Sequence, residues 1–233
     1  MKFDSYYNQA VCRFMQLLMA MFVCMGNQIE AASLSELLET RGFVAVNKMD
    51  TTIKVRLMYA TPDNFAEVIL YDDIRDAYLH PDAAKALFKA QEELHKLFPS
   101  YNLLVKDAAR PMSVQRRMFS AVQGTPKANY VANPAKGGGL HNYGLAVDIT
   151  IVDENGNELA MGTPVDHLGP EANIDKEDRM VRDGVISETE RQNRLLLRRV
   201  MTAAGFKPLR TEWWHFNLVG KRQAQAAYKL LDF

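Results

Sequence analysis

The pattern of apolar and polar positions predicts four helices, over residues 33–41, 81–98, 114–122 and 187–204. In the second helix, Leu87, Leu94 and Leu97 fall on one stripe, as expected for a helix that covers a core. In the fourth, Ser187 and Glu190 have the spacing of a capping box, which marks the start of a helix. The segments between these helices have a different periodicity.

Short apolar or alternating runs predict strands, over residues 43–47, 53–58, 103–106, 145–152, 158–161 and 213–219. In the fourth of these, Ala146 and Asp148 point to the same face, because successive side chains of a strand alternate. Asn155 and Gly156 form a hairpin-turn signal between two of the runs. No interior linker divides the chain. We therefore expect a single α+β domain with a small, mostly antiparallel sheet flanked by helices.

The first 32 residues have the character of a secretory signal. Lys2 and Arg13 precede an apolar run over residues 14–25, and small residues follow it. The alternative is a buried N-terminal helix; the run is too short to span a bilayer comfortably. We expect residues 1–32 to be a signal peptide removed on export to the periplasm. Residues 33–233 would then form the folded domain, with no stable membrane insertion.

The composition narrows the class of protein further. The chain has 28 basic and 28 acidic residues, so its zero net charge gives no indication of a nucleic-acid partner. Both cysteines, Cys12 and Cys24, fall inside the expected signal, so any metal in the mature chain must be held by nitrogen and oxygen ligands. Lipid attachment at Cys24 is less expected, because Val23 stands where such sites carry a small residue.

His141 and Asp148 are the first candidates for chemistry. His141 follows three glycines, at 137–139, that allow close approach of the backbone to a ligand. Asp148 lies in the middle of an apolar strand, where a carboxylate is costly to bury unless it is paired or bound to a metal. Taken alone, the pair fits a metal site, but it also fits an aspartate bonded to a loop with His141 on the surface.

The segment Glu212-Trp213-Trp214-His215 adds an imidazole and a second carboxylate beside an apolar wall. Two histidines and one carboxylate with an open fourth position are the form of a catalytic zinc site, and a nearby glutamate can act as its general base. Residues three apart in a regular strand point to opposite faces, so Glu212 and His215 share a site only with an irregular entry or a bulge. The alternative is an aromatic core strand in which His215 is a buried histidine with its hydrogen bonds made inside the protein.

The joint pattern of GGLHNYGLAVDITI and EWWHF resembles the D-alanyl-D-alanine dipeptidases of the VanX type. These belong to the zinc D,D-peptidases that share a fold with the hedgehog signalling domain. The resemblance extends over most of the mature chain and includes the segments VRLMYATPDNF, DAYLHPDAAKAL, VKDAARP, MGTPVD and QNRLLLRRVM. It implies a zinc-dependent dipeptidase that hydrolyses D-Ala-D-Ala or a related cell-wall dipeptide.

The resemblance also implies a role for each matching residue. The ligands of one Zn²⁺ per chain would be His141, Asp148 and His215. The general base would be Glu212, and the oxyanion would be stabilised by Arg110. The ammonium of a small dipeptide substrate would pair with Asp166, which distinguishes a dipeptidase from a carboxypeptidase.

Two positions depart from the family pattern, and two other functions remain open. Gly139 stands where the family usually has a serine that helps to hold substrate, and Ala109 replaces an aromatic residue commonly found beside the arginine.

The first alternative function is a D,D- or L,D-carboxypeptidase that trims peptidoglycan peptides. The second is a non-catalytic wall-binding module on the same fold. The oligomeric state does not follow from the sequence.

Overall fold

The computed structural model describes residues 32–233. The expected signal peptide lies almost entirely outside the described residues, so its cleavage and export remain predictions. Within residues 32–233, no helix combines the length and apolar character that a membrane span requires.

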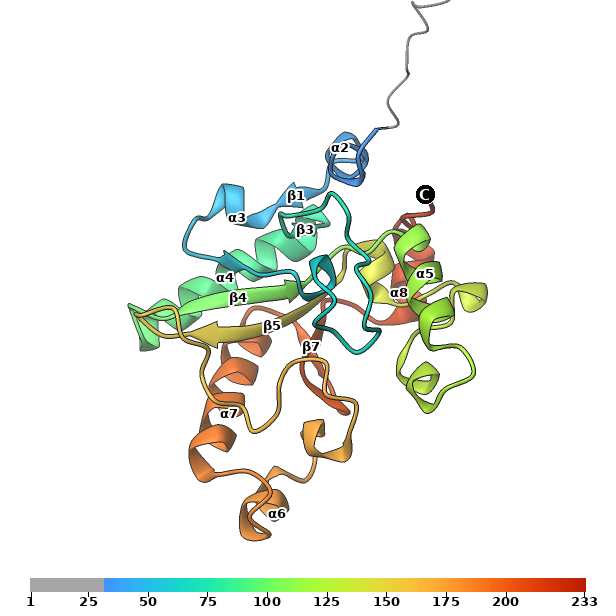
Figure 1. Cartoon of the computed structure of the whole chain (residues 1–233). Helices are drawn as coiled ribbons and strands as arrows, with labels where there is room; N and C mark the ends of the chain where they lie inside the picture. The colour runs from blue at the N-terminus through green and yellow to red at the C-terminus, as the bar shows by residue number, and fades with distance from the viewer. Residues whose placement is uncertain (1–31) are drawn as a thin grey trace, which may run out of the picture. The chain divides into compact units, whose positions relative to one another are not determined.

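A five-stranded sheet forms the centre of the domain (Figure 1). In spatial order its strands are β2 (Lys54–Val55), β4 (Asn102–Asp107), β5 (Ala146–Val152), β7 (Glu212–Asn217) and β6 (Lys207–Leu209). Only the β2–β4 pair is parallel, and the other three pairings are antiparallel. A separate ribbon pairs β1 (Val44–Ala45) with β3 (Tyr78–Leu79). The α+β fold with a mostly antiparallel sheet is thus confirmed.

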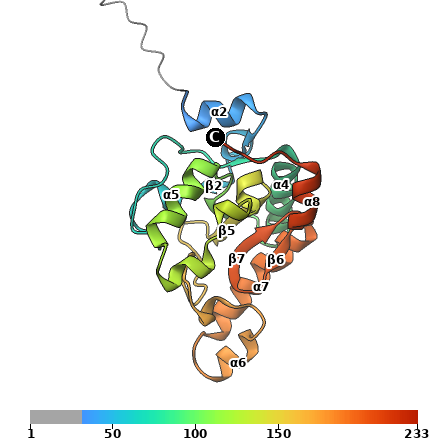
Figure 2. The same ribbon diagram turned by 90° about the vertical axis from the view of Figure 1, so that its right-hand side faces the viewer.

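Helices cover both faces of the sheet. They are α2 (Leu34–Thr40), α3 (Val46–Met49), α4 (Pro81–Leu97), α5 (Met112–Val122), α6 (Glu177–Arg182), α7 (Glu188–Ala203) and α8 (Lys221–Ala227). Short 3₁₀ turns are η1 (Met58–Ala60), η2 (Pro126–Tyr130), η3 (Pro134–Lys136), η4 (Leu140–Tyr143) and η5 (Pro170–Ala172). Figure 2 shows the sheet between α5 on one side and α4 with α7 on the other.

The four predicted helices are present, and three of them, α2, α4 and α7, begin at a side-chain cap. The side chain of Ser187 accepts a hydrogen bond from the backbone N–H of Glu190, and the Glu190 side chain accepts one in return, so the capping box of α7 is confirmed. Leu87 and Leu94 of α4 are fully buried, but Leu97 is 37% exposed because the helix ends there, beyond the edge of the core.

The central strand β5 carries the alternation that its sequence predicts. Val147, Ile149 and Ile151 are fully buried in the hydrophobic core. Asp148 and Thr150, on the opposite face, are also buried. Because both faces are covered, the charged carboxylate of Asp148 needs a partner inside the protein.

Three strand predictions were too long. The 43–47 run pairs only over Val44–Ala45, because Asn47 then bonds to Asp76 and to the backbone N–H of Ala77 and the chain turns into α3. The 53–58 run pairs only over Lys54–Val55 before η1.

The third over-long strand is the 158–161 run, which makes a single bridge from Glu158 to Val152. The turn at residues 155–156 is present, with Asp153 accepting bonds from two backbone N–H groups. The chain then leaves the sheet because the carbonyl of Met161 bonds to Arg194 of α7 instead of to a strand. The short elements β6, α6 and α8 were not predicted.

Candidate active site

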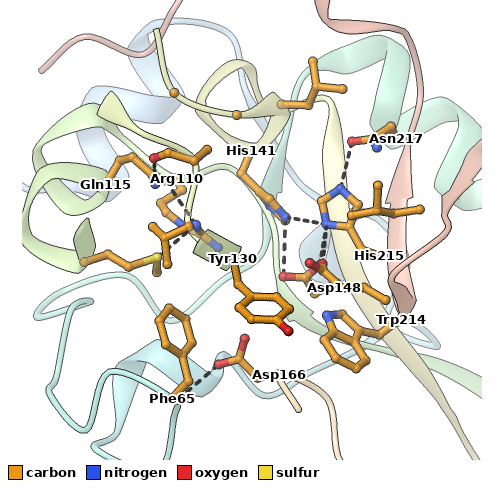
Figure 3. A pocket seen from close by; sticks show the side chains of 18 of the residues that line it. Phe65, Arg110, Gln115, Tyr130, His141, Asp148, Asp166, Trp214, His215 and Asn217 are labelled. Carbon is orange, nitrogen blue, oxygen red and sulfur yellow. Dashed lines mark hydrogen bonds and ion pairs between the residues drawn. The ribbon is translucent and has the colours of Figure 1, made fainter. Parts of the chain in front are cut away.

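A cavity of about 330 Å³ opens between β5, β7 and the loop of residues 124–139. All six residues singled out in the sequence line it: Arg110, His141, Asp148, Asp166, Glu212 and His215. Other lining residues that bear on its chemistry are Tyr59, Phe65, Gln115, Tyr130, Gly139, Trp214, Asn217 and Lys221. Figure 3 shows many of these side chains converging on one space.

His141, Asp148 and His215 form a compact group at the base of the cavity (Figure 3). His141 Nε2 lies 3.3 Å from His215 Nδ1 and 3.4 Å from Asp148 Oδ2. His215 Nδ1 lies 2.9 Å from Asp148 Oδ1. One ligand atom from each residue lies within 4.8 Å of the others, a spacing that suits a single divalent cation with two nitrogen ligands and one oxygen ligand.

The second nitrogen of each imidazole has a fixed partner that sets its tautomer. Nδ1 of His141 is 2.7 Å from the carbonyl of Ala108, so it is the nitrogen that donates. Nε2 of His215 is 2.9 Å from Oδ1 of Asn217. The remaining nitrogens, Nε2 of His141 and Nδ1 of His215, face the carboxylate of Asp148, and each would release its proton and present a lone pair when a metal ion binds.

Local structure brings the three side chains together. Asp148 and His215 are directly opposite each other in the antiparallel β5–β7 pair. His141 lies in η4, which ends at Gly144 in the left-handed conformation, with φ of 63°. A Cβ at position 144 would lie 2.3 Å from the ring of Phe43, so both the turn and the packing require glycine there.

The charges within the group are strongly coupled. Burial by itself would raise the pKa of Asp148, but the charge of His141 and hydrogen bonds from both histidines hold that pKa well below its usual range. Burial would lower the pKa of His215, but Asp148 outweighs it and raises that pKa to about 9. The carboxylate is therefore ionised and ready to bind a cation.

Glu212 reaches the same cavity through a bulge. In the β6–β7 pair, Pro208 is opposite Phe216, but the next residue, Leu209, is opposite Glu212. The three β7 residues between Glu212 and Phe216 therefore have no partner in β6, and the register shifts at this point. Oε2 of Glu212 consequently lies 3.8 Å from Nδ1 of His215, although the two residues are three apart in a strand. Burial raises the pKa of Glu212, against the opposing charge of His215. The irregular entry that the sequence required is present.

Arg110 lies at the cavity wall in a buried network. Its guanidinium pairs with Asp107 and donates to Gln115 at 3.1 Å. Asp107 also accepts a 2.5 Å bond from the hydroxyl of Tyr71. Burial would lower the pKa of Arg110, but the charge of Asp107 keeps it well above its ordinary value. The arginine is therefore a fixed positive charge beside the metal-ligand group.

Asp166 lies on the other side of the cavity, in a left-handed backbone conformation with φ of 73°. Its carboxylate accepts hydrogen bonds from the Tyr59 hydroxyl at 3.1 Å and from the backbone N–H of Phe65 at 3.3 Å. Burial, followed by the charge of Asp148, raises the pKa of Asp166 to about 7. No cationic side chain within residues 32–233 forms an ion pair with it, so it is available to a cationic group of a ligand.

The comparisons with known proteins agree with this geometry. The sequence profile of the D-ala-D-ala dipeptidase family, peptidase family M15, matches residues 39–231. This chain belongs to that family. M15 peptidases are metal-dependent, in keeping with the group formed by His141, Asp148 and His215.

Named relatives of this M15 peptidase cover most of its length. It is 32% identical over 179 residues to the D-alanyl-D-alanine dipeptidase of Escherichia coli, covering 77% of this chain and 83% of that protein. It is 27% identical over 198 residues to the enzyme of the same name from Enterococcus faecalis, covering 76% and 92%. The one from Streptomyces coelicolor is 29% identical over 197 residues, covering 77% and 92%.

The two departures from the family pattern have structural counterparts in this M15 peptidase. A Cβ at Gly139 would lie 3.2 Å from that of Ala132, so the loop closes tightly against the glycine and the wall there is backbone. Ala109 is buried in the core. The aromatic contact with Arg110 comes from Tyr59, whose ring centre lies 5.0 Å from the guanidinium.

Three supporting residues of this M15 peptidase were not predicted from its sequence. Asn217 could have been found, because it lies two residues after His215 and so on the same face of β7. Asp107 lies in the quoted Asp-x-x-Arg-Pro segment, and its pairing with Arg110 was not foreseen. Tyr59 had no local signal, because only the fold brings η1 to Asp166.

Proposed function

We propose that the protein is a zinc-dependent dipeptidase that hydrolyses D-Ala-D-Ala or a related dipeptide derived from the cell wall. The observation that carries the proposal is the convergence of His141, Asp148, His215, Glu212 and Asp166 on one cavity. The names of the relatives support the choice of substrate class. The proposal includes cleavage of residues 1–32 as a signal peptide and action of the catalytic domain, residues 33–233, in the periplasm.

The donor set suits zinc. Two neutral imidazoles and a carboxylate are the usual protein ligands of a catalytic zinc, and each imidazole is oriented by an outer hydrogen bond. His141, Asp148 and His215 would hold the ion. When bound, zinc supplies Lewis acidity that activates water and polarises the scissile carbonyl.

Glu212 would act as the general base. Its carboxylate lies beside the ligand group, and burial raises its pKa toward the range in which a carboxylate can both accept and return a proton. It would take a proton from the attacking water and then deliver it to the amine of the leaving amino acid. A binding module would have no need of a base in this position.

Arg110 would stabilise negative charge on the carbonyl oxygen during attack. Four of its five N–H groups have partners among residues 32–233, which leaves one N–H on Nη2 to donate. Because Asp107 and Gln115 hold the guanidinium, this donor is already oriented before the reaction.

Asp166 favours a dipeptidase over a carboxypeptidase. Its carboxylate faces the cavity with no ion-pair partner within residues 32–233, so it can pair with the free ammonium of a dipeptide. A carboxypeptidase acting on longer wall peptides would place an uncharged peptide group there, and a buried carboxylate would be left unpaired.

The test is hydrolysis of a dipeptide panel by purified mature protein loaded with zinc, followed by mass spectrometry. The panel contains D,D-, L,D- and L,L-dipeptides and the N-acetylated form of each. We expect hydrolysis of free D,D-dipeptides and little or none of the acetylated forms. Preferential cleavage of acetylated substrates would indicate a carboxypeptidase, and zinc binding without any hydrolysis would indicate a wall-binding module.

A further inference from the structure

A free dipeptide carries two charges, and Asp166 accounts for only one of them. If the ammonium pairs with Asp166, the carboxylate at the other end needs a cation or several donors, because an unpaired charge in a partly closed cavity is unfavourable. The following inference rests on the proposed dipeptidase function and concerns which residue of this chain binds that carboxylate.

Lys221, the first residue of α8, lines the same cavity as Asp166 and the metal-ligand group. Its ammonium donates to the carbonyl of Gly138 at 2.8 Å and, at 3.4 Å, to that of Lys136. No carboxylate within residues 32–233 forms an ion pair with it. Two neutral backbone carbonyls therefore hold the ammonium in place, and no negative charge of the described residues neutralises it.

Arg110, the other cation held in the cavity wall, already has partners for most of its N–H groups. Arg110 pairs with Asp107, which is completely buried, and its remaining bonds to Gln115 and Met118 leave one N–H. That single donor is assigned to the carbonyl oxygen in the proposed reaction. His141 and His215 are assigned to the metal. Among the described residues that line the cavity, Lys221 is the cationic side chain that remains.

Lys221 is placed to meet the carboxylate end of a dipeptide whose ammonium lies at Asp166. In Figure 3, Asp166 and Asn217 lie on opposite sides of the group formed by His141, Asp148 and His215. Lys221 follows Asn217 by four residues, and its ammonium is bonded to the carbonyl of Gly138, which also lines the cavity. In a dipeptide the ammonium and the carboxylate likewise flank the scissile carbonyl.

The wall near this end of the cavity offers backbone rather than a hydroxyl. Gly139 has no side chain, and the loop packs against it at Ala132. A lysine on α8 can supply by charge what no side chain at position 139 can supply by hydrogen bonding.

We propose that Lys221 binds the C-terminal carboxylate of the dipeptide and thereby makes the enzyme selective for substrates with a free C-terminus. An amidated dipeptide would keep the scissile bond and the ammonium but lose this ion pair. A charge-assisted hydrogen bond in a partly closed site corresponds to about a tenfold effect on kcat/KM.

The experiment compares a free D,D-dipeptide with its C-terminal amide, using the zinc-loaded wild type, Lys221→Met, Lys221→Arg and Arg222→Met. Arg222 is the matched control, because it is an exposed cation next in sequence that does not line the cavity. We expect the wild type and Arg222→Met to prefer the free dipeptide about tenfold or more. Lys221→Met should lose that preference, mainly through KM, and Lys221→Arg should retain most of it.

The preference of the wild type should also shrink as salt is added, because an ion pair open to solvent is screened. If Lys221 only fixes the Gly138 carbonyl, Lys221→Met will weaken hydrolysis of both substrates equally, and that result overturns the inference while leaving the dipeptidase function in place. An unchanged preference in Lys221→Met overturns it as well. Hydrolysis of neither substrate by the wild type would overturn both proposals.

Discussion

Asn217 gives a direct test of how a hydrogen bond to a metal-binding histidine supports the metal site. Its Oδ1 accepts the Nε2–H of His215 at 2.9 Å, and the His215 side chain is only 12% exposed. Asn217→Leu keeps a side chain of similar size but removes the acceptor. When a cation holds Nδ1 of His215, the Nε2–H must then face a hydrocarbon. In the metal-free protein, the single proton of the neutral ring can lie on Nδ1 and bond to Asp148, so no N–H is left unpaired.

The loss therefore falls mainly on the metal-bound state. A buried donor left without an acceptor costs about 1–3 kcal/mol. Since about 1.4 kcal/mol is a factor of ten, zinc affinity should fall by about tenfold to a hundredfold, the range expected when an outer-layer partner of a metal-bound histidine is removed.

The assay is competition for zinc against a chromophoric chelator at fixed pH, with folding checked by circular dichroism. Asn217→Asp is the matched control, because it keeps an acceptor at the same position and should bind zinc at least as tightly as the wild type. Folded Asn217→Leu protein with a zinc affinity within about twofold of both would refute the reasoning.

Three further predictions follow from the same geometry. Glu212→Gln should keep its zinc but lose about two to four orders of magnitude in kcat, and near-normal turnover by metal-loaded protein would remove Glu212 from the role of base. KM for a free dipeptide should rise as the pH falls through the pKa of Asp166, because only the carboxylate pairs with ammonium. That pKa is raised to about 7, and a bound cation that offsets Asp148 would lower it, so the break should lie at or below pH 7 and vanish in Asp166→Asn. A break that persists in the variant would assign it to another group. Arg194→Met should lower the free energy of unfolding by about 2 kcal/mol and raise KM, because the buried guanidinium bonds to the carbonyls of Met161 and Glu171, which precede and follow Asp166 in the chain. Denaturant titration measures the first effect and dipeptide kinetics the second. An unchanged free energy of unfolding together with an unchanged KM would count against the prediction.

The longer elements could be predicted because their signals are local. The stripe and capping box of α7, the alternation of β5 and the turn at residues 155–156 all depend on residues within a few positions of one another. The two-residue strands β1 and β2 were predicted too long, and β3 and β6 were not predicted, because pairing partners set where such short strands begin and end. Arg194 is an example at long range, since it takes the Met161 carbonyl away from a possible strand.

The sequence by itself determined the chemical types available to the site: two imidazoles, their carboxylate partner, a second acid, an arginine, and no cysteine within residues 33–233. Only the tertiary structure decided how these groups meet. The β5–β7 register sets Asp148 opposite His215, the bulge turns Glu212 toward the same space, and the docking of η1 and α8 brings Tyr59 and Lys221 to the cavity. The physical reason is that local sequence fixes backbone conformation and side-chain alternation. The distance between segments tens of residues apart depends on strand register and packing across the whole core.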